Sequence, residues 1–133
     1  MTDSQSQVEF AYRVLIVEDE TLIRWAVVEA LTAAGHHVFE APDAATALRL
    51  VAEASEPLDA VVLDLRLPDS SDLSLLAAIR RNTPSSAVVM MTAHGTPEDA
   101  AGARALGAFD VVEKPFDVQR LERLVTAACR ARP

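Results

Sequence analysis

The sequence predicts an α/β domain in which a parallel sheet of five strands is flanked by five helices. Short apolar runs rich in valine, such as Ala60 to Leu63, are typical of strands buried on both faces of a sheet. These runs alternate with segments of helical periodicity at a regular spacing. Such alternation favours parallel strands joined by right-handed crossovers, with helices on both faces of the sheet.

Five segments are expected to form the strands. They are Arg13 to Val17, His37 to Glu40, Ala60 to Leu63, Ala87 to Met91 and Phe109 to Val112. Pro68 follows the third segment and stops further ladder pairing, because proline has no backbone N–H to donate. The second segment ends in nothing comparable to the charged or hydroxyl groups that follow the others, as expected of a strand at the sheet edge.

Each strand is followed by a segment with helical periodicity and recognisable ends. The helices are expected over Thr21 to Ala34, from Pro42-Asp43 to about Ala54, from Ser70-Ser71-Asp72 to Arg81, from Thr96 to Leu106, and after Asp117. Asp43 and Asp117 are predicted N-caps, and Thr96 with Asp99 has the spacing of a capping box. Gly35 lies where a helix end requires positive φ.

Several side chains are assigned to packing rather than to chemistry. Trp25 is expected to pack its helix against the core, and Cys129 to fill a helix face. His36 and His37 are assigned to a turn and a strand start, because no cysteine or carboxylate cluster has metal-ligand spacing with them. Two helices carry apolar stripes that are expected to be buried. They are Leu75, Leu76 and Ile79 in the third helix and Val118, Leu121, Leu124, Val125 and Ala128 in the last helix.

Composition indicates one globular domain, with 133 residues of which 50% are hydrophobic. Residues 1–11 are expected to be a disordered tail and residues 12–131 the folded domain. The net charge of −8 argues against direct binding to nucleic acid or to an anionic membrane, so a DNA-directed role would need another domain or partner. A single cysteine fits a cytoplasmic location, and no apolar run approaches the roughly 18 residues of a membrane span.

Polar groups end four of the predicted strands. Glu18 and Asp19 follow the first, Asp64 the third, Thr92 the fourth and Lys114 the fifth. Since parallel strands bring their carboxyl ends to one edge of a sheet, these side chains should converge. Clustered carboxylates repel one another, and Mg²⁺ with its preference for oxygen ligands would remove that cost. A carboxylate is also a possible phosphoryl acceptor, with lysine neutralising the developing charge.

Each of these residues has a simpler explanation when taken alone. Glu18 and Asp19 would interact favourably with the dipole of the following helix. Asp64 could cap the next turn, Thr92 could be an ordinary hydroxyl at a strand end, and Lys114 a solvated loop lysine. Their joint occurrence at four strand ends favours a phosphoryl-transfer site.

With these residues in place, the sequence resembles a response-regulator receiver domain over residues 12–130. The motifs that carry the resemblance are Val17-Glu18-Asp19-Glu20, Asp64 with Pro68, Met91-Thr92-Ala93 and Glu113-Lys114-Pro115-Phe116. Within the family it is most similar to the receiver of the nitrogen-regulatory class of transcriptional activators. That similarity rests on Ile23-Arg24-Trp25, Met91-Thr92-Ala93-His94, Gly107-Ala108-Phe109-Asp110 and Lys114-Pro115-Phe116-Asp117.

The resemblance implies a flavodoxin-like receiver fold with strand order 2-1-3-4-5. It implies that Asp64 accepts a phosphoryl group from a sensor histidine kinase or a small phosphodonor. Asp19 and Asp64, with the backbone carbonyl of Arg66, would bind Mg²⁺, and Glu18 would act through water. Thr92 would turn toward the phosphoryl group and Lys114 would pair with it. The peptide bond between Lys114 and Pro115 would be cis.

Two positions depart from the family pattern. Val111 stands where the family usually has an aromatic residue that moves inward with the switch threonine, so coupling through an aromatic ring is not expected here. Asp72 stands where the family usually has glycine, and it is expected to tolerate a left-handed backbone at some cost.

The helix from Thr96 to Leu106 is a candidate for the element that switches. It is rich in alanine, has Leu106 as its only large apolar residue, and carries Gly102 near its middle. The alternative is an ordinary alanine-rich surface helix. Charges on this helix, the fifth strand and the last helix would either be solvated or form a homodimer surface after phosphorylation; they are Glu98, Asp99, Asp110, Glu113, Arg120 and Arg123.

Arg66 and His94 would either screen the phosphoryl group from water, and so set its lifetime, or point to solvent.

The sequence therefore indicates a phosphorylation-dependent signalling module that controls a transcriptional output, and not an independent enzyme. A constitutive pseudo-receiver is the first alternative, disfavoured by the complete set of acid, threonine and lysine. A flavin protein is disfavoured because acids follow the first strand in place of a phosphate-binding loop. An aspartate-nucleophile phosphatase would have a second acid where Arg66 stands. The class continues into ATPase and DNA-binding domains, so an excised receiver and a stand-alone receiver both remain open.

Overall fold

The computed structural model describes residues 11–132, so the predicted tail lies outside the described residues except for Ala11. Five parallel strands form one sheet in the order β2-β1-β3-β4-β5, which confirms the predicted order. The strands are β1 (Arg13–Val17), β2 (His37–Ala41), β3 (Ala60–Asp64), β4 (Ala87–Thr92) and β5 (Asp110–Glu113). The sheet edges are β2 and β5, as expected for the second strand.

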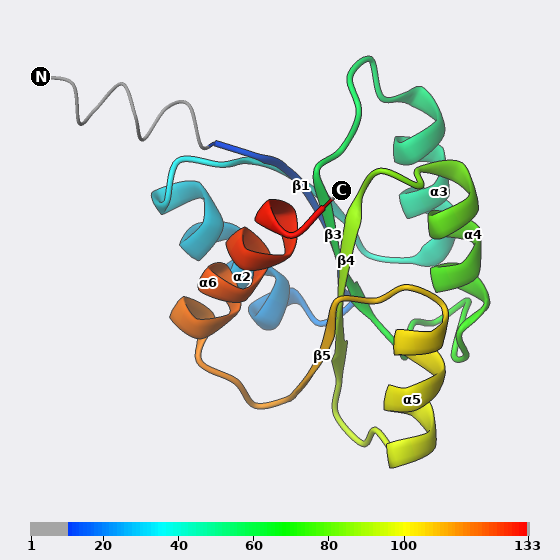
Figure 1. Ribbon diagram of the computed structural model, residues 1–133. Coiled ribbons are helices and arrows are strands. Elements are labelled where there is room, and N and C mark those ends of the chain that lie inside the picture. Colours follow the sequence, from blue (N-terminus) through cyan, green and yellow to red (C-terminus); the bar gives the residue numbers. More distant parts are fainter. Residues whose placement is uncertain (1–10, 133) are drawn as a thin grey trace, which may run out of the picture.

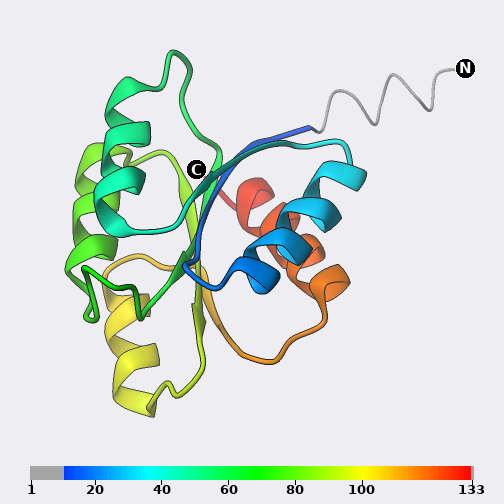
Figure 2. The same ribbon diagram turned by 180° about the vertical axis from the view of Figure 1, so that it is seen from behind.

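Five helices, labelled from α2 to α6, cover both faces of the sheet. They are α2 (Thr21–Ala33), α3 (Ala44–Glu53), α4 (Ser74–Asn82), α5 (Pro97–Ala105) and α6 (Val118–Arg130). Figures 1 and 2 show α2 and α6 together on one face, with α3, α4 and α5 on the other. Within residues 11–132, no helix is both long and apolar enough to cross a membrane.

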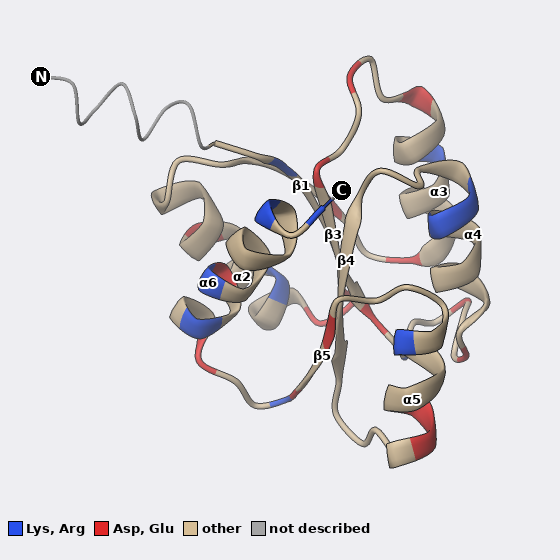
Figure 3. Ribbon diagram, in the orientation of Figure 1, with Lys and Arg blue, Asp and Glu red and all other residues tan. Residues whose placement is uncertain are grey.

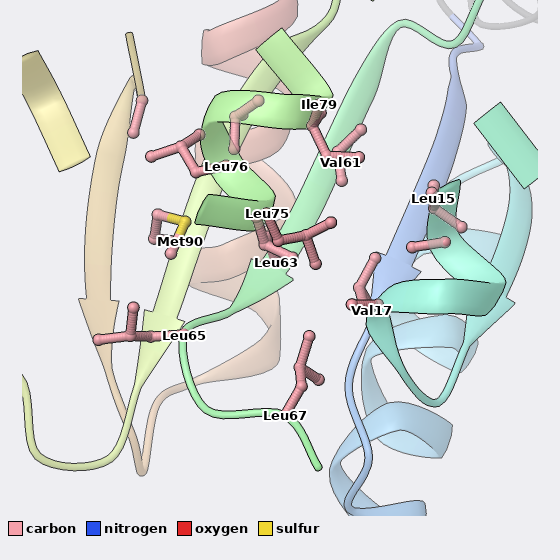
Figure 4. Packing of buried hydrophobic residues seen from close by; sticks show 14 of the residues in the cluster. Leu15, Val17, Val61, Leu63, Leu65, Leu67, Leu75, Leu76, Ile79 and Met90 are labelled. Atoms are coloured by element: carbon pink, nitrogen blue, oxygen red, sulfur yellow. The ribbon is translucent and has the colours of Figure 1, made fainter. Parts of the chain in front are cut away.

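The alternation of side chains along the strands explains why their sequences are apolar throughout. In β1, Leu15 and Val17 pack on the α3–α4 side, whereas Val14 and Ile16 pack on the α2–α6 side. Strands β3 and β4 divide their residues in the same way. Figure 4 shows the first of these two layers closing over the sheet beneath α4. Each central strand is thus buried on both faces, as its valine-rich run predicted.

The predicted helix ends are confirmed by their hydrogen bonds. The side chain of Asp43 accepts from Thr46 N at 2.8 Å, and that of Asp117 accepts from Gln119 N at 2.9 Å. Thr96 Oγ1 accepts from Asp99 N at 3.1 Å while the Asp99 carboxylate accepts from Thr96 N at 3.2 Å, which completes the capping box. These bonds satisfy backbone donors that no helical carbonyl reaches.

The backbone takes the special conformations that were predicted at two further places. Gly35 adopts a φ of 98° just after α2, and the peptide bond between Lys114 and Pro115 is cis. The expectation for Asp72 is wrong, because among the described residues only glycines have positive φ. Asp72 Oδ1 instead accepts from Ser74 N at 2.9 Å and caps the turn into α4. Local side-chain bonding therefore replaces the conformational freedom of glycine at this turn.

The prediction that Trp25 packs against the core is also wrong. Trp25 is 62% exposed and Leu22 is 81% exposed, and both lie on the outer side of α2. The helix is anchored instead by Val27 and Leu31, which are almost fully buried. Two large apolar side chains therefore stand in solvent on the first turns of α2.

Candidate functional site

An acidic cluster lies where β1 and β3 end, closed by the ammonium group of one lysine. Lys114 Nζ lies 2.6 Å from Glu18 Oε1, 3.0 Å from Asp64 Oδ2 and 3.0 Å from Glu20 Oε1. The side chains of Glu18, Asp64 and Lys114 are at most 8% exposed. Figure 3 shows acidic segments gathered at this lower rim of the sheet. The structure therefore brings together three acids and one base from three separate strand ends.

Parallel pairing and two loop contacts position these groups. Asp64 is the last residue of β3 and lies opposite Met91 in β4, so that Thr92 follows at the same rim. Lys114 N donates to the carbonyl of Thr92 at 2.8 Å, which extends the pairing of β4 with β5 up to the lysine. Asp69, in the loop after β3, accepts from Ala44 N at 2.8 Å and from Ala45 N, and so fastens that loop to the start of α3.

Burial and charge shift the proton affinities in this cluster. The pKa of Glu18 is raised to about 7, chiefly because burial disfavours its ionised form, and the contact with Lys114 only partly offsets this. Burial alone would lower the pKa of Lys114, but its contacts with Glu18, Glu20 and Asp64 outweigh that effect and raise it. Lys114 therefore remains an ammonium ion and is the counter-charge of the cluster.

Thr92 completes the rim with a hydroxyl group that lacks a partner. Its side chain is 2% exposed, and its Oγ1 makes no hydrogen bond to any described residue. A buried hydroxyl without a partner costs about 1–3 kcal/mol. The backbone of Gly95 lies so close that a Cβ there would be 2.6 Å from Thr92 Cγ2. The Thr92 hydroxyl is thus a hydrogen-bond donor without a partner among the described residues. The methyl group of the same side chain touches the loop leading into α5.

The other predicted site residues lie at the margin of the cluster. Asp19 is exposed and is outside the group of described carboxylates whose oxygens approach within 4.8 Å. Arg66 and His94 are also exposed, and Arg66 N donates to Asp64 Oδ1 at 3.1 Å. Val111 is half-buried against the core beneath α3 and α4. The assigned roles of these four residues stay predictions.

Sequence reasoning missed Glu20 as a member of the cluster. Its carboxylate joins those of Glu18 and Asp64 in the group whose oxygens lie within 4.8 Å of one another. The signal was present in the unbroken acidic run from Glu18 to Glu20, but sequence alone does not say which of its side chains turn inward. In the structure the carboxylates of the first and third approach Asp64, although Glu20 itself stays exposed, while Asp19 is exposed and lies outside the group.

The donor set fits a hard divalent cation. All three clustered groups are carboxylates, and Mg²⁺ binds oxygen ligands through one or two carboxylates while keeping several waters. Lys114 contacts all three acids but supplies only one positive charge. It therefore neutralises only part of their charge, and the cluster would attract a further cation. Asp19, exposed beside the cluster, is free to rotate toward such an ion.

Comparison with known proteins agrees with this geometry. Residues 14–126 match the model of the response regulator receiver domain. The chain is 38% identical over 118 residues to a putative NtrX-like response regulator of Rickettsia conorii, covering 87% of this chain and 24% of that protein. It is 38% identical over 118 residues to the DNA-binding transcriptional regulator NtrC of Proteus hauseri, covering 86% and 24%. The chain thus spans about a quarter of the length of these relatives.

A solved structure with a similar fold is the beryllofluoride-activated NtrC4 receiver domain dimer. It is 32% identical to this chain, has a TM-score of 0.81, and covers 89% of this chain and 96% of that one. The matched fold, the acid cluster at the strand ends and the family model all lead to one assignment. The chain belongs to the response regulator receiver domains.

Proposed function

Receiver domains serve phosphorylation-dependent signalling, and we propose that Asp64 is the phosphoryl acceptor of this one. The phosphoryl donor is the phosphohistidine of a sensor histidine kinase. The observation that carries this proposal is the buried carboxylate of Asp64, held 3.0 Å from the Lys114 ammonium among the acids at the strand ends. Such an arrangement places a positive charge where phosphoryl oxygens would lie.

The transfer is a displacement at phosphorus. A carboxylate oxygen of Asp64 forms a bond to phosphorus as the bond from phosphorus to the imidazole nitrogen breaks. The electron pair of that bond stays on the imidazole nitrogen, and the ring leaves as neutral imidazole because its other nitrogen carries a proton in the phosphohistidine. The aspartyl phosphate that results carries its charge on three oxygens, and Lys114 is the cation nearest to them.

Mg²⁺ would neutralise the charge that develops on the phosphoryl oxygens. Asp19, Asp64 and the backbone carbonyl of Arg66 would hold it, with Glu18 acting through water. The exposed position of Asp19 and the inward position of Glu18 agree with one direct and one water-mediated role. Glu20 adds a further carboxylate, grouped with those of Glu18 and Asp64.

Phosphorylation is proposed to act on α5 through Thr92. The unpartnered Oγ1 of Thr92 gains a phosphoryl oxygen as acceptor when the side chain turns toward Asp64. Because Gly95 packs directly on the Thr92 methyl group, this turn alters the loop that leads into the cap of α5 at Thr96. Because Val111 has a small side chain and no aromatic ring, the contact between Thr92 and Gly95 is the proposed route by which Thr92 acts on α5.

The surface formed by α5, β5 and α6 is proposed to dimerise after phosphorylation. Asp99 and Asp110 already have partners within the chain, in the capping box and in a 2.7 Å ion pair with Arg104. Glu98, Glu113, Arg120 and Arg123 remain exposed on these three elements. Figure 3 shows acidic residues at the start of α5 and basic residues on α6. A solved relative is described as a beryllofluoride-activated dimer, which supports the proposal.

Exposed apolar side chains beside the site support docking of a kinase helix. Leu22 lines a shallow groove that runs past Lys114 to Phe116, and Trp25 stands in solvent on the same helix. Large apolar groups in solvent are typical of protein interfaces.

In a longer protein, the signal would pass from this receiver to a transcriptional output domain, as the relatives named for transcriptional regulation suggest.

Arg66 and His94 are proposed to set the lifetime of the aspartyl phosphate. Both are exposed, and they stand two residues beyond Asp64 and Thr92. Replacing Arg66 with Ala should change the rate of phosphate loss without abolishing phosphorylation. An unchanged decay rate would contradict the role of Arg66.

The experiment that tests the function is phosphorylation by acetyl phosphate with Mg²⁺, followed by mapping of the modified residue by mass spectrometry. The wild-type protein should gain one phosphoryl group on the peptide that contains Asp64, and Asp64→Asn should gain none. Asp72→Asn is the matched control, because this acid lies in the same loop region but accepts from Ser74 N in the turn before α4. A wild-type protein that gains no phosphoryl group would favour a pseudo-receiver.

A further inference from the structure

Arg24 reaches from α2 back to the turn that carries the acids of the site. Its Nη1 donates to the carbonyl oxygen of Glu18 at 2.8 Å, and its Nε donates to Glu40 Oε1 at 2.9 Å. The Arg24 side chain is 18% exposed and its bond to Glu18 is partly buried, whereas the side chain of Glu40 is 54% exposed. One guanidinium group therefore joins α2, the end of β1 and the end of β2.

Lys114 holds the side chains of Glu18 and Glu20, whereas the backbone from Glu18 to Glu20 has few other restraints. Glu18 N donates to the carbonyl of Ala41, which ends the pairing of β1 with β2, and Glu20 N folds back onto Glu18 Oε2 at 3.0 Å. Glu20 is the N-cap residue of α2 but makes no capping bond through its side chain. The carbonyl of Glu20 accepts the first backbone bond of α2, from Arg24 N at 2.9 Å, whereas the carbonyl of Glu18 is held by the Arg24 side chain.

The chemistry of the pair explains why arginine suits this position. Three consecutive acids repel one another, and the planar guanidinium places a permanent positive charge against the carbonyl between the first and the second of them. Its two donors point in fixed directions, so one carboxylate and one carbonyl are held at the same time. Glu40 orients the group from the edge strand, which gives β2 an indirect part in a site to which its sequence appeared to add nothing.

We propose that Arg24, oriented by Glu40, is a positioning residue for the divalent cation of the acidic cluster. Arg24 does not touch the cation; it fixes the turn so that the carboxylates of Glu18 and Glu20 stay near Asp64. The inference rests on the proposed function, since it concerns the Mg²⁺ that phosphorylation of Asp64 would use. Its consequence is that losing Arg24 weakens binding of the cation but spares the transfer step once the site is filled.

The test measures Mg²⁺ binding directly by titration calorimetry and, separately, the rate of phosphorylation by acetyl phosphate as a function of Mg²⁺ concentration. Arg24→Met should raise the dissociation constant for Mg²⁺ by about tenfold, as loss of a group that orients metal ligands does. Arg24→Lys should have an intermediate effect, because one ammonium cannot hold both partners in the same geometry. The phosphorylation rate at saturating Mg²⁺ should stay within about twofold of wild type.

Two further variants make the result specific. Glu40→Gln should weaken Mg²⁺ binding less than Arg24→Met, and the double variant should bind no more weakly than Arg24→Met alone, because both changes act on one contact. Arg13→Met is the matched control, since this arginine starts β1 at the opposite rim, where its guanidinium has a 3.7 Å ion pair to Glu56 and lies 5.0 Å from the centre of the Phe39 ring. It should leave the dissociation constant for Mg²⁺ unchanged. Circular dichroism verifies that each variant is folded.

The outcomes separate this inference from the proposed function. If wild type is phosphorylated at Asp64 and Arg24→Met and Glu40→Gln bind Mg²⁺ as wild type does, the positioning role is refuted and the function stands. A lower rate of Arg24→Met at saturating Mg²⁺, with the same dissociation constant, refutes it equally. If wild type binds Mg²⁺ with the predicted dependence on Arg24 but is not phosphorylated, the positioning role stands and the function fails. A wild-type protein that binds no Mg²⁺ refutes both.

Discussion

The two helices on either side of β5 differ sharply in how they are held. Over 13 residues, α6 buries Leu121, Val125, Ala128 and Cys129 against the sheet. Over nine residues, α5 buries Ala103 alone. Both helices have side-chain N-caps, so the difference lies in packing and not in local signals. Most helical stability in proteins comes from burial of an apolar face, and α5 has little of it.

This difference indicates which part of the molecule can change at low cost. Elements with few buried apolar contacts open with free energies well below that of global unfolding. Helix α5 is held by its capping box, by an exposed ion pair between Arg104 and Asp110, and by contact of Gly102 with Leu73. Its first turn follows the loop that touches Thr92. The weakly held helix is therefore the one next to the proposed phosphorylation site.

Matched leucine truncations should show the largest contrast. Leu121→Ala in α6 is expected to lower the free energy of unfolding by about 2–5 kcal/mol, because it leaves a cavity in the core. Leu106→Ala, at the exposed C-cap of α5, should lower it by less than about 1 kcal/mol. Urea unfolding of both variants measures the difference. Equal losses would mean that α5 is anchored more firmly than its burial indicates.

The thiol on the buried face of α6 should make stability depend on alkaline pH. Burial raises the pKa of Cys129 to about 11, against about 9 in the unfolded chain. Stability from the protonated thiol is therefore fully present below pH 9 and is lost as the pH rises through 11, by less than about 3 kcal/mol. Urea unfolding between pH 8 and 11 should show a steeper loss for wild type than for Cys129→Ala. Parallel curves would contradict this burial of the thiol.

Removal of a helix cap should have the smallest effect on stability and still distinguish the two helices. Thr96→Ala and Asp117→Ala each remove one N-cap, at a cost of about 1 kcal/mol. Amide hydrogen exchange should accelerate throughout α5 in the first variant. In the second it should accelerate only in the first turn of α6, because the buried face holds the rest. Uniform acceleration along α6 would remove the distinction between the helices.

Much of the fold follows from local signals in the sequence. The caps at Asp43, Thr96 and Asp117 are decided by residues within three positions, and the valine-rich strands carry their own two-sided burial. The face that α2 turns to the core was not predictable, because apolar residues surround much of this helix. Only contact with the sheet and α6 selects Val27 and Leu31 over Leu22 and Trp25.

The candidate site was predictable in outline but not in its contacts. Strand ends in a parallel sheet meet at one rim, which places Glu18, Asp64 and Lys114 together whatever the details of the loops. The inward turn of Glu20 depends on side-chain directions in a tight turn. The bond between Arg24 and Glu40 joins residues 16 positions apart, and no local pattern reveals it.

Hydrogen exchange with and without beryllofluoride tests the central claim that phosphorylation of the acidic cluster acts on the weakly packed helix. In wild type with Mg²⁺, we expect beryllofluoride to change amide exchange in α5 and the loop before it, while the core of α6 around Leu121 and Val125 stays as protected as before. Asp64→Asn should show no change in either helix. A response of equal size in both helices, or the same response in Asp64→Asn, would contradict the account.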